Sequence, residues 1–108
     1  MDLYNDDYPV IEYKILSYLY GCLKQGKEPD SRKIDKSKMG INERYWEKVI
    51  YSLADEREIT GVYEGDNGRV VFKGLSITRK GIKRLFQDDM MRMASEYLKD
   101  TKAYLPHP

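Results

Sequence analysis

The sequence predicts a mostly α-helical domain that contains one small antiparallel β-hairpin. Apolar side chains recur at helical spacing in several segments, a β-rich stretch is split by an Asn-Gly turn, and more helical sequence follows that stretch. The 108 residues are 41% hydrophobic and 34% charged, which suits a single domain with one core. We therefore assign residues 1–108 to one domain and expect frayed ends at residues 1–7 and 105–108.

The first helix is predicted to run to about Gln25. Asp7 and Pro9 form its start, as a capping carboxylate before a proline in the first turn, and Gly26 ends it. Apolar side chains occupy two nearly opposite sides of this helix, so we expect it to be either the central helix or part of a dimer interface. The polar positions form one continuous strip, made of Lys14, Ser17, Gly21, Lys24 and Gln25.

Two further helices are predicted before the hairpin. Residues 27–41 are polar and indicate a loop followed by a short helix that ends near Gly40. Asn42 is expected to cap a third helix from Glu43 to about Arg57, with one apolar face. The outer face of this third helix carries Arg44, Glu47, Lys48, Tyr51 and Asp55.

The hairpin is predicted to pair Ile59–Tyr63 with Arg69–Phe72 around a turn over residues 65–68. Thr78 is expected to cap a fourth helix. One side of the fourth helix is apolar, with Ile82, Leu85 and Phe86, and the other is polar, with Lys80, Lys83, Arg84 and Gln87.

A fifth helix, capped by Asp88 or Asp89, is strongly amphipathic. Its apolar side is expected to hold Met90, Met93, Ala94, Tyr97, Leu98, Thr101 and Tyr104. Three helices, a hairpin and further helix together predict a winged helix-turn-helix with an extra C-terminal amphipathic helix, since the hairpin needs a helical surface to cover its apolar side.

Three segments, together with the methionine-rich last helix, point to a known group of proteins. They are Tyr45 to Leu53, Glu58-Ile59-Thr60-Gly61-Val62, and Ile77-Thr78-Arg79-Lys80-Gly81 with Leu85 after it. Through them the chain resembles the YjcQ-like family of small winged-helix proteins from Gram-positive bacteria and their phages, over about residues 11–102. The resemblance implies a winged-helix fold, an association with phage or prophage genes and a poorly defined molecular role. It implies no catalytic or binding residues.

The sequence argues against enzymatic chemistry. The only histidine, His107, is flanked by prolines near the end of the chain, where nothing orients it as a general base. No Gly-rich phosphate loop and no pair of His or Cys residues with metal-ligand spacing is present. We expect no catalytic, cofactor-binding or metal-binding residues and no small-molecule substrate. The acidic clusters Asp6-Asp7, Asp55-Glu56-Glu58 and Asp88-Asp89 are expected at helix ends or exposed turns.

The single cysteine and the acidic first residues indicate a cytoplasmic protein. Cys22 cannot form an intramolecular disulfide and is expected to be a small buried apolar side chain in a reducing compartment. Residues 1–7 lack the basic and apolar segments of a signal peptide, and no apolar stretch approaches membrane-spanning length. We expect no membrane association.

Any binding to double-stranded DNA must depend on local basic patches. Lys and Arg total 19 against 18 for Asp and Glu, so the net charge of +1 gives no long-range attraction to a polyanion. In this fold the outer face of the third helix and the wing would meet DNA. Glu47 and Asp55 share that face and oppose the phosphates. The candidate contacts are Lys33, Lys36, Lys38, Arg44, Lys48, Tyr51, Arg69 and Lys73.

The alternative is an interaction or adaptor module that binds protein or a second copy of itself. The chain has ten tyrosines, five of them in or just before the first helix, and tyrosine and methionine side chains both serve in adaptable protein interfaces. The same side chains also serve as core packing. The candidate interface residues are Tyr13, Tyr20, Met90, Met93, Tyr97 and Leu98. The sequence leaves both functions open.

Overall fold

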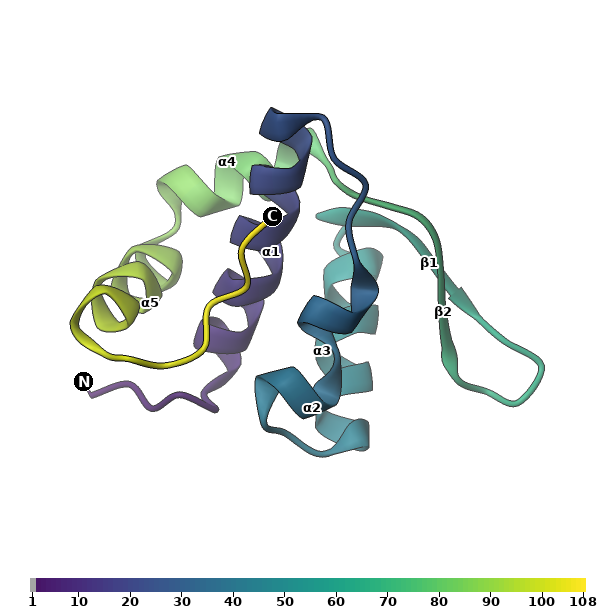
Figure 1. The fold of residues 1–108 in the computed structure, drawn as a ribbon, viewed down its shortest axis with the longest axis horizontal. Helices are drawn as coiled ribbons and strands as arrows, with labels where there is room; N and C mark the ends of the chain where they lie inside the picture. The colour runs from purple at the N-terminus through teal and green to yellow at the C-terminus, as the bar shows by residue number, and fades with distance from the viewer. Residues whose placement is uncertain (1) are drawn as a thin grey trace.

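The computed structural model describes residues 2–108 and has the element order predicted for a winged helix-turn-helix (Figure 1). The elements are α1 (Tyr8–Gln25), a 3-10 turn η1 (Ser31–Ile34), α2 (Lys36–Met39), α3 (Glu43–Asp55), β1 (Ile59–Glu64), β2 (Val70–Ile77), α4 (Arg79–Gln87) and α5 (Asp89–Asp100). The fold class predicted from the sequence, a mostly helical domain with an antiparallel hairpin and an extra C-terminal helix, is confirmed.

Helix α1 is the central element, with α4 and α5 on one side and α3 and the hairpin on the other (Figure 1). Both of its apolar sides contact other elements, as the sequence predicted, although Tyr13 and Tyr20 are only half-buried and Leu23 is exposed. Ile11, Ile15, Leu16 and Leu19 lie in the main core, and Cys22 is buried there as a small apolar side chain. A smaller cluster joins Val10 of α1 to Ala94 and Leu98 of α5.

Three of the predicted helix caps form. The Asn42 side chain accepts a hydrogen bond from the Tyr45 amide at 2.9 Å, and Thr78 accepts one from Gly81 at 3.1 Å. The choice between Asp88 and Asp89 falls on Asp88, which accepts from the Met91 amide at 3.1 Å. Each side chain satisfies an amide that has no partner within its own helix.

The prediction that the Asp7 carboxylate caps α1 is wrong. Asp7 occupies the N-cap position, but its Oδ2 accepts a hydrogen bond from the Tyr4 amide at 2.7 Å instead of from the helix. The Asp7 amide in turn donates to the Tyr4 carbonyl at 3.0 Å. This tight turn folds the N-terminal segment back onto the helix, and the Tyr45 hydroxyl holds it there by donating to the Asp6 carbonyl at 2.6 Å.

The polar strip of α1 is partly covered, which the sequence did not predict. Lys14 is fully buried and donates to Asn5 Oδ1 at 2.7 Å, and burial lowers the pKa of its ammonium. Pro108 packs directly against Gly21, and the C-terminal segment crosses in front of α1 (Figure 1). The two ends of the chain therefore have contacts on this strip, and fraying of residues 1–7 and 105–108 stays a prediction.

Helix α5 ends at Asp100, so the prediction that it continues through Thr101 and Tyr104 is wrong. Thr101 is extended, with φ −117° and ψ 160°, and the chain then turns toward η1. There the Tyr104 hydroxyl donates to the Lys33 carbonyl at 2.7 Å. The side of α5 that is fully buried carries Met91, Ala94 and Leu98, whereas Met90 and Met93 are only half-buried.

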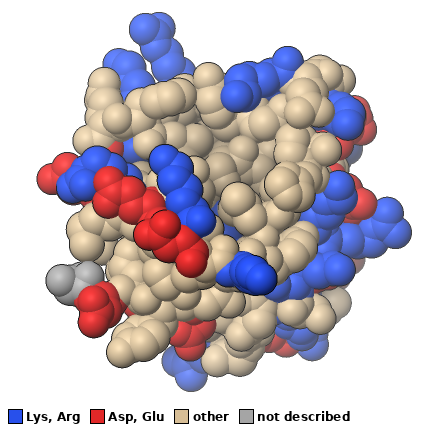
Figure 2. All heavy atoms as spheres, turned by 60° about the vertical axis from the view of Figure 1, so that its left-hand side comes forward, with Lys and Arg blue, Asp and Glu red and all other residues tan. Residues whose placement is uncertain are grey.

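Phe86 was expected on the apolar side of α4 with Ile82 and Leu85, but it points outward and is 72% exposed. Its ring meets the ring of Tyr20 edge to face, with 5.7 Å between the centroids. Figure 2 brings the α4 and α5 side of the molecule forward and shows a broad uncharged area across its upper half, with Lys and Arg side chains at the edges. This part of the surface therefore carries few charges for so highly charged a chain.

The wing is an antiparallel pair with Ile59 opposite Ile77 and Glu64 opposite Val70. Strand β2 extends to Ile77, well beyond the predicted end at Phe72, because its second half pairs with the start of β1. A bulge interrupts the pairing at Gly61, which has φ +85°. A Cβ there would lie 2.6 Å from the backbone of Gly74, so only glycine fits.

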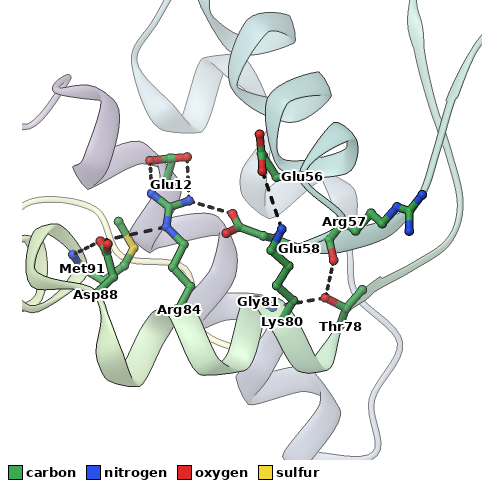
Figure 3. A network of polar contacts seen from close by, with 10 residues as sticks. All are labelled: Glu12, Glu56, Arg57, Glu58, Thr78, Lys80, Gly81, Arg84, Asp88 and Met91. Atoms are coloured by element: carbon green, nitrogen blue, oxygen red, sulfur yellow. Dashed lines mark hydrogen bonds and ion pairs between the residues drawn. The ribbon is translucent and has the colours of Figure 1, made fainter.

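The hairpin joins α4 through a close backbone contact (Figure 3). The Thr78 amide donates to the Glu58 carbonyl at 3.0 Å, and the Thr78 hydroxyl donates to the Arg57 carbonyl at 2.6 Å. A Cβ on Gly81 would lie 2.4 Å from the Glu58 carbonyl oxygen. Glycine at this position therefore allows the first turn of α4 to lie against the start of β1.

Two expectations about charged residues are wrong at this joint. Arg84 was expected on the outer side of α4 and Glu58 in an exposed acidic cluster, yet the two side chains form an ion pair at 2.7 Å in the interior. Arg84 also binds both carboxylate oxygens of Glu12, at 2.7 and 2.9 Å (Figure 3). Hydrogen bonding to Glu12 is the main cause that raises the pKa of Arg84 above its usual range.

Candidate nucleic-acid interface

Helix α3 is held firmly between the preceding turn and the wing. The Trp46 indole Nε1 donates to the Ile34 carbonyl at 2.8 Å, and its ring meets the Phe72 ring of β2 edge to face at 6.0 Å. Val49, Ile50 and Leu53 bury the inner face of the helix in the main core. The opposite face is therefore presented outward in a fixed orientation beside the wing.

The outer face of α3 carries two unpaired basic side chains. Arg44 and Lys48 are exposed one helical turn apart, and neither makes an ion pair with any carboxylate of residues 2–108. With Glu47 and Tyr51 they line a shallow hollow. The hollow is thus lined by two basic side chains and one acidic side chain, and Asp55, the second carboxylate that the sequence placed on this face, is exposed outside the hollow.

Tyr51 sits at the edge of this hollow. Its hydroxyl is buried and has no hydrogen-bond partner among the residues that the structure describes. Burial, together with the nearby carboxylates of Glu64 and Glu47, raises the pKa of its phenol.

One carboxylate connects α2, α3 and the wing. Glu43, in the first turn of α3, pairs with Lys36 Nζ at 3.4 Å, and the same oxygen accepts from the Arg69 guanidinium of the wing. We call this three-residue contact the Glu43 bridge. It brings two of the predicted contacts, Lys36 and Arg69, beside the outer face of α3.

The other predicted contacts do not all join this surface. Lys33 Nζ donates to the His107 carbonyl at 2.7 Å, and Lys38 Nζ lies 5.8 Å from the centre of the Tyr104 ring. Both lysines therefore face the C-terminal segment. Lys73 is exposed on β2 and makes no ion pair with the residues that the structure describes. Seven of the eight predicted residues thus form two groups rather than one continuous face, and Lys73 belongs to neither group.

The comparison with known protein families covers the part of the chain that forms α3, the wing and α4. The sequence model of the YjcQ protein family matches residues 13–104, which include this whole unit. The chain belongs to the YjcQ family. No curated protein and no solved structure matched the chain.

The family assignment confirms the resemblance inferred from the sequence, and the structure explains the residues that carried it. In this YjcQ domain Ile77 pairs with Ile59, Thr78 caps α4 and Gly81 allows the close contact with Glu58. Gly61 forms the bulge of the wing. These residues build the joint between the wing and α4 and do not line the outer face of α3.

The predicted protein-interface residues lie in three different places. Tyr13 and Tyr20 line a groove between α1, α4 and α5, whereas Met93 and Tyr97 line a separate hollow beside the N-terminal segment. Met90 is half-buried. Leu98 is only 8% exposed and packs in the small cluster, so it belongs to the interior.

Sequence reasoning missed two features of this domain. The Glu43–Arg69 contact of the Glu43 bridge spans 26 positions, and Arg84 reaches Glu12 across 72 positions. The only signal for the first was an acidic residue in the first turn of α3. Among residues 2–108, no three His, Cys, Asp or Glu side chains group as a metal site, and no helix meets the length and hydropathy of a membrane span.

Proposed function

We propose that this YjcQ domain is a non-enzymatic, cytoplasmic DNA-binding protein that inserts α3 into a major groove and lays the wing against the adjacent backbone. The observation that carries the proposal is the pair of exposed, unpaired side chains Arg44 and Lys48 on the outward face of a firmly held α3. A helix of this kind beside a wing is the geometry by which winged helices read duplexes. A role in regulating phage or prophage genes is part of the proposal and is based on the family resemblance.

The Glu43 bridge determines the affinity and the salt dependence that we expect for DNA binding at this surface. A DNA phosphate can replace the Glu43 carboxylate as the partner of Lys36 and Arg69, which adds contacts from α2 and the wing. Glu43 and Glu47 remain close by and repel the backbone. We therefore expect binding of moderate strength that depends steeply on salt, because each phosphate contact releases a counterion.

Fluorescence anisotropy with a labelled duplex of random sequence tests the proposal. We expect Arg44→Ala combined with Lys48→Ala to weaken binding by about tenfold or more at low salt and to reduce the salt slope by roughly two. The matched control is Lys83→Ala combined with Lys102→Ala, which removes the same charge from exposed positions away from α3. No duplex binding at low salt, or equal losses in both double variants, would refute the proposed interface.

Protein binding is the second candidate function, and the apolar surface on the α4 side favours it. Phe86 is 72% exposed and its ring contacts the Tyr20 ring, so a pair of aromatic side chains is accessible to a partner on this surface. A homodimer is one form of this function. Sedimentation would then give a two-chain mass that Tyr97→Asp reduces to one, and a monomeric wild-type chain would exclude the dimer.

A further inference from the structure

We infer that the groove between α1, α4 and α5 binds an acidic, apolar peptide segment of a partner protein. This inference rests on the second candidate function, whose partner class it names, and it is independent of DNA binding. The groove has a volume of about 450 Å³. It is lined along α1 by Tyr13, Ser17, Tyr20, Gly21 and Lys24, along α4 by Leu85 and Phe86, and along α5 by Arg92, Ser95, Glu96 and Lys99.

The floor of the groove is apolar and firmly built. The rings of Tyr20 and Phe86 meet at 90° with centroids 5.7 Å apart, so each fixes the other. The Tyr13 hydroxyl donates to Ser95 Oγ at 3.2 Å and ties α1 to α5 beneath the opening. Aromatic rings that are already ordered lose little conformational freedom when a partner covers them, which favours their use as anchors.

The rim of the groove is basic. Lys24 Nζ lies 4.8 Å from the centre of the Tyr20 ring, and neither Lys24 nor Lys99 pairs with a carboxylate of residues 2–108. Arg92 is already neutralised by Glu96 at 3.3 Å. Two cations without partners beside exposed aromatic rings thus complement a segment that carries apolar side chains flanked by Asp or Glu.

The same charges argue against two other occupants. A second copy of the chain that docked symmetrically would place another net basic rim, with Lys24 and Lys99, against this one, and like charges oppose such contact. A nucleic acid would bring a phosphate at every nucleotide past Glu96, whereas a peptide with a few acidic residues can place them beside Lys24 and Lys99 alone. An acidic peptide with apolar anchors satisfies both the floor and the rim.

The groove lies on the α4 and α5 side of α1, away from the outer face of α3 (Figure 1). In Figure 2 this side shows the uncharged area with basic side chains at its edges. A partner could therefore occupy the groove while α3 and the wing contact a duplex. The domain would then join an acidic partner protein to DNA without competition between the two sites.

A display library of short random peptides, selected on the immobilised full chain, tests the inference. We expect the enriched sequences to combine an aromatic or aliphatic residue with at least two acidic residues nearby. A synthetic copy should bind about tenfold more weakly to Phe86→Asp, because that exposed side chain anchors the peptide. If Phe86→Asp does not fold by circular dichroism, Phe86→Ala, which removes the ring without adding a charge, replaces it.

Charge variants separate the rim from the rest of the surface. Lys24→Glu combined with Lys99→Glu should also weaken the peptide by about tenfold, while Lys83→Glu combined with Lys102→Glu leaves affinity within about twofold. Enriched peptides that lack acidic residues, or no enrichment at all, would overturn the inference. Peptides that bind Phe86→Asp as tightly as wild type would show that the groove is not the peptide site, while protein binding elsewhere on the chain would remain supported. If oligothymidylate binds the wild-type chain in competition with the peptide and does not bind Phe86→Asp, the groove is a nucleic-acid site instead.

Discussion

Two ion networks of opposite composition occupy opposite sides of this domain. At the joint of the wing and α4, one cation, Arg84, holds the two carboxylates of Glu12 and Glu58. At the Glu43 bridge, one carboxylate holds the two cations of Lys36 and Arg69. The first network has side chains that are 23%, 7% and 8% exposed, whereas those of the second are 37%, 48% and 58% exposed.

This difference in burial assigns the two networks different roles. A buried carboxylate that loses its partner stays desolvated and charged, so the Arg84 network is expected to determine whether α1, β1 and α4 stay assembled. An exposed carboxylate that loses its partner is solvated by water at little cost. The Glu43 bridge therefore contributes little to stability, and its cations stay available to an anionic ligand such as DNA.

The largest expected effect comes from breaking the buried network. Arg84→Met leaves Glu12 and Glu58 without a cation, and we expect the free energy of unfolding to fall by about 3–5 kcal/mol in urea denaturation at neutral pH. The control is Arg92→Met, which removes an exposed pair with Glu96 and should cost less than about 1 kcal/mol. Similar losses of unfolding free energy in Arg84→Met and Arg92→Met would show that burial does not determine how much an ion pair contributes to stability.

A smaller effect of opposite sign is expected at Lys14, the buried cation that lacks a carboxylate partner among residues 2–108. Within the described part of the chain, the Lys14 ammonium donates to Asn5 Oδ1 at 2.7 Å. Lys14→Met keeps the length of the side chain and removes the desolvated charge, so we expect the free energy of unfolding to rise by roughly 1–2 kcal/mol. A loss of stability would mean that the Asn5 contact outweighs the desolvation of the ammonium.

The pH dependence of that gain follows from the sign of the pKa shift. Burial lowers the pKa of Lys14 below 10.5, so between the folded and the unfolded pKa the unfolded chain binds more protons and wild-type stability rises with pH. The advantage of Lys14→Met should therefore be full at neutral pH and shrink as the pH rises toward 10.5. Urea denaturation of both proteins across this range measures the difference, and an advantage that grows with pH would contradict the shift.

The smallest effect on stability is expected at the exposed network. Glu43→Gln should change the free energy of unfolding by less than about 1 kcal/mol, yet raise duplex affinity by about threefold or more because Lys36 and Arg69 lose their competing carboxylate. Glu56→Gln is the matched control, since it removes the same charge from an exposed pair with Lys80 on α4. Equal gains in both variants would attribute the effect to net charge alone.

Local features of this domain could be predicted from the sequence, and distant ones could not. Asn42 and Thr78 cap helices because their partners lie three residues away, and the Asn-Gly turn of the wing is equally local. The burial of Lys14 and the end of α5 at Asp100 depend instead on where the two chain ends lie. The Asp7 side chain was misassigned because the Tyr4 amide, three residues before it, donates to its carboxylate in place of the helix amide three residues after it.

The residues of the candidate interface on α3 could also be predicted from the sequence, whereas contacts from distant parts of the chain could not. The helical repeat was enough to place Arg44 and Lys48 on one face, because the outward side of α3 follows from its apolar side. It could not separate Lys33 and Lys38 from that face, since the contacts of these lysines with His107 and Tyr104 come from the far end of the chain. The outward position of Phe86 likewise depends on Tyr20 in another helix.

The most direct test of the account is a titration of the isotope-labelled chain with a random-sequence duplex at low salt, followed by amide chemical shifts. We expect the largest shifts at Arg44, Lys48 and Arg69, with little change in α4 and α5. Shifts confined to α4 and α5, or none anywhere at saturating duplex, would contradict the claim that the exposed face of α3 and the wing bind DNA.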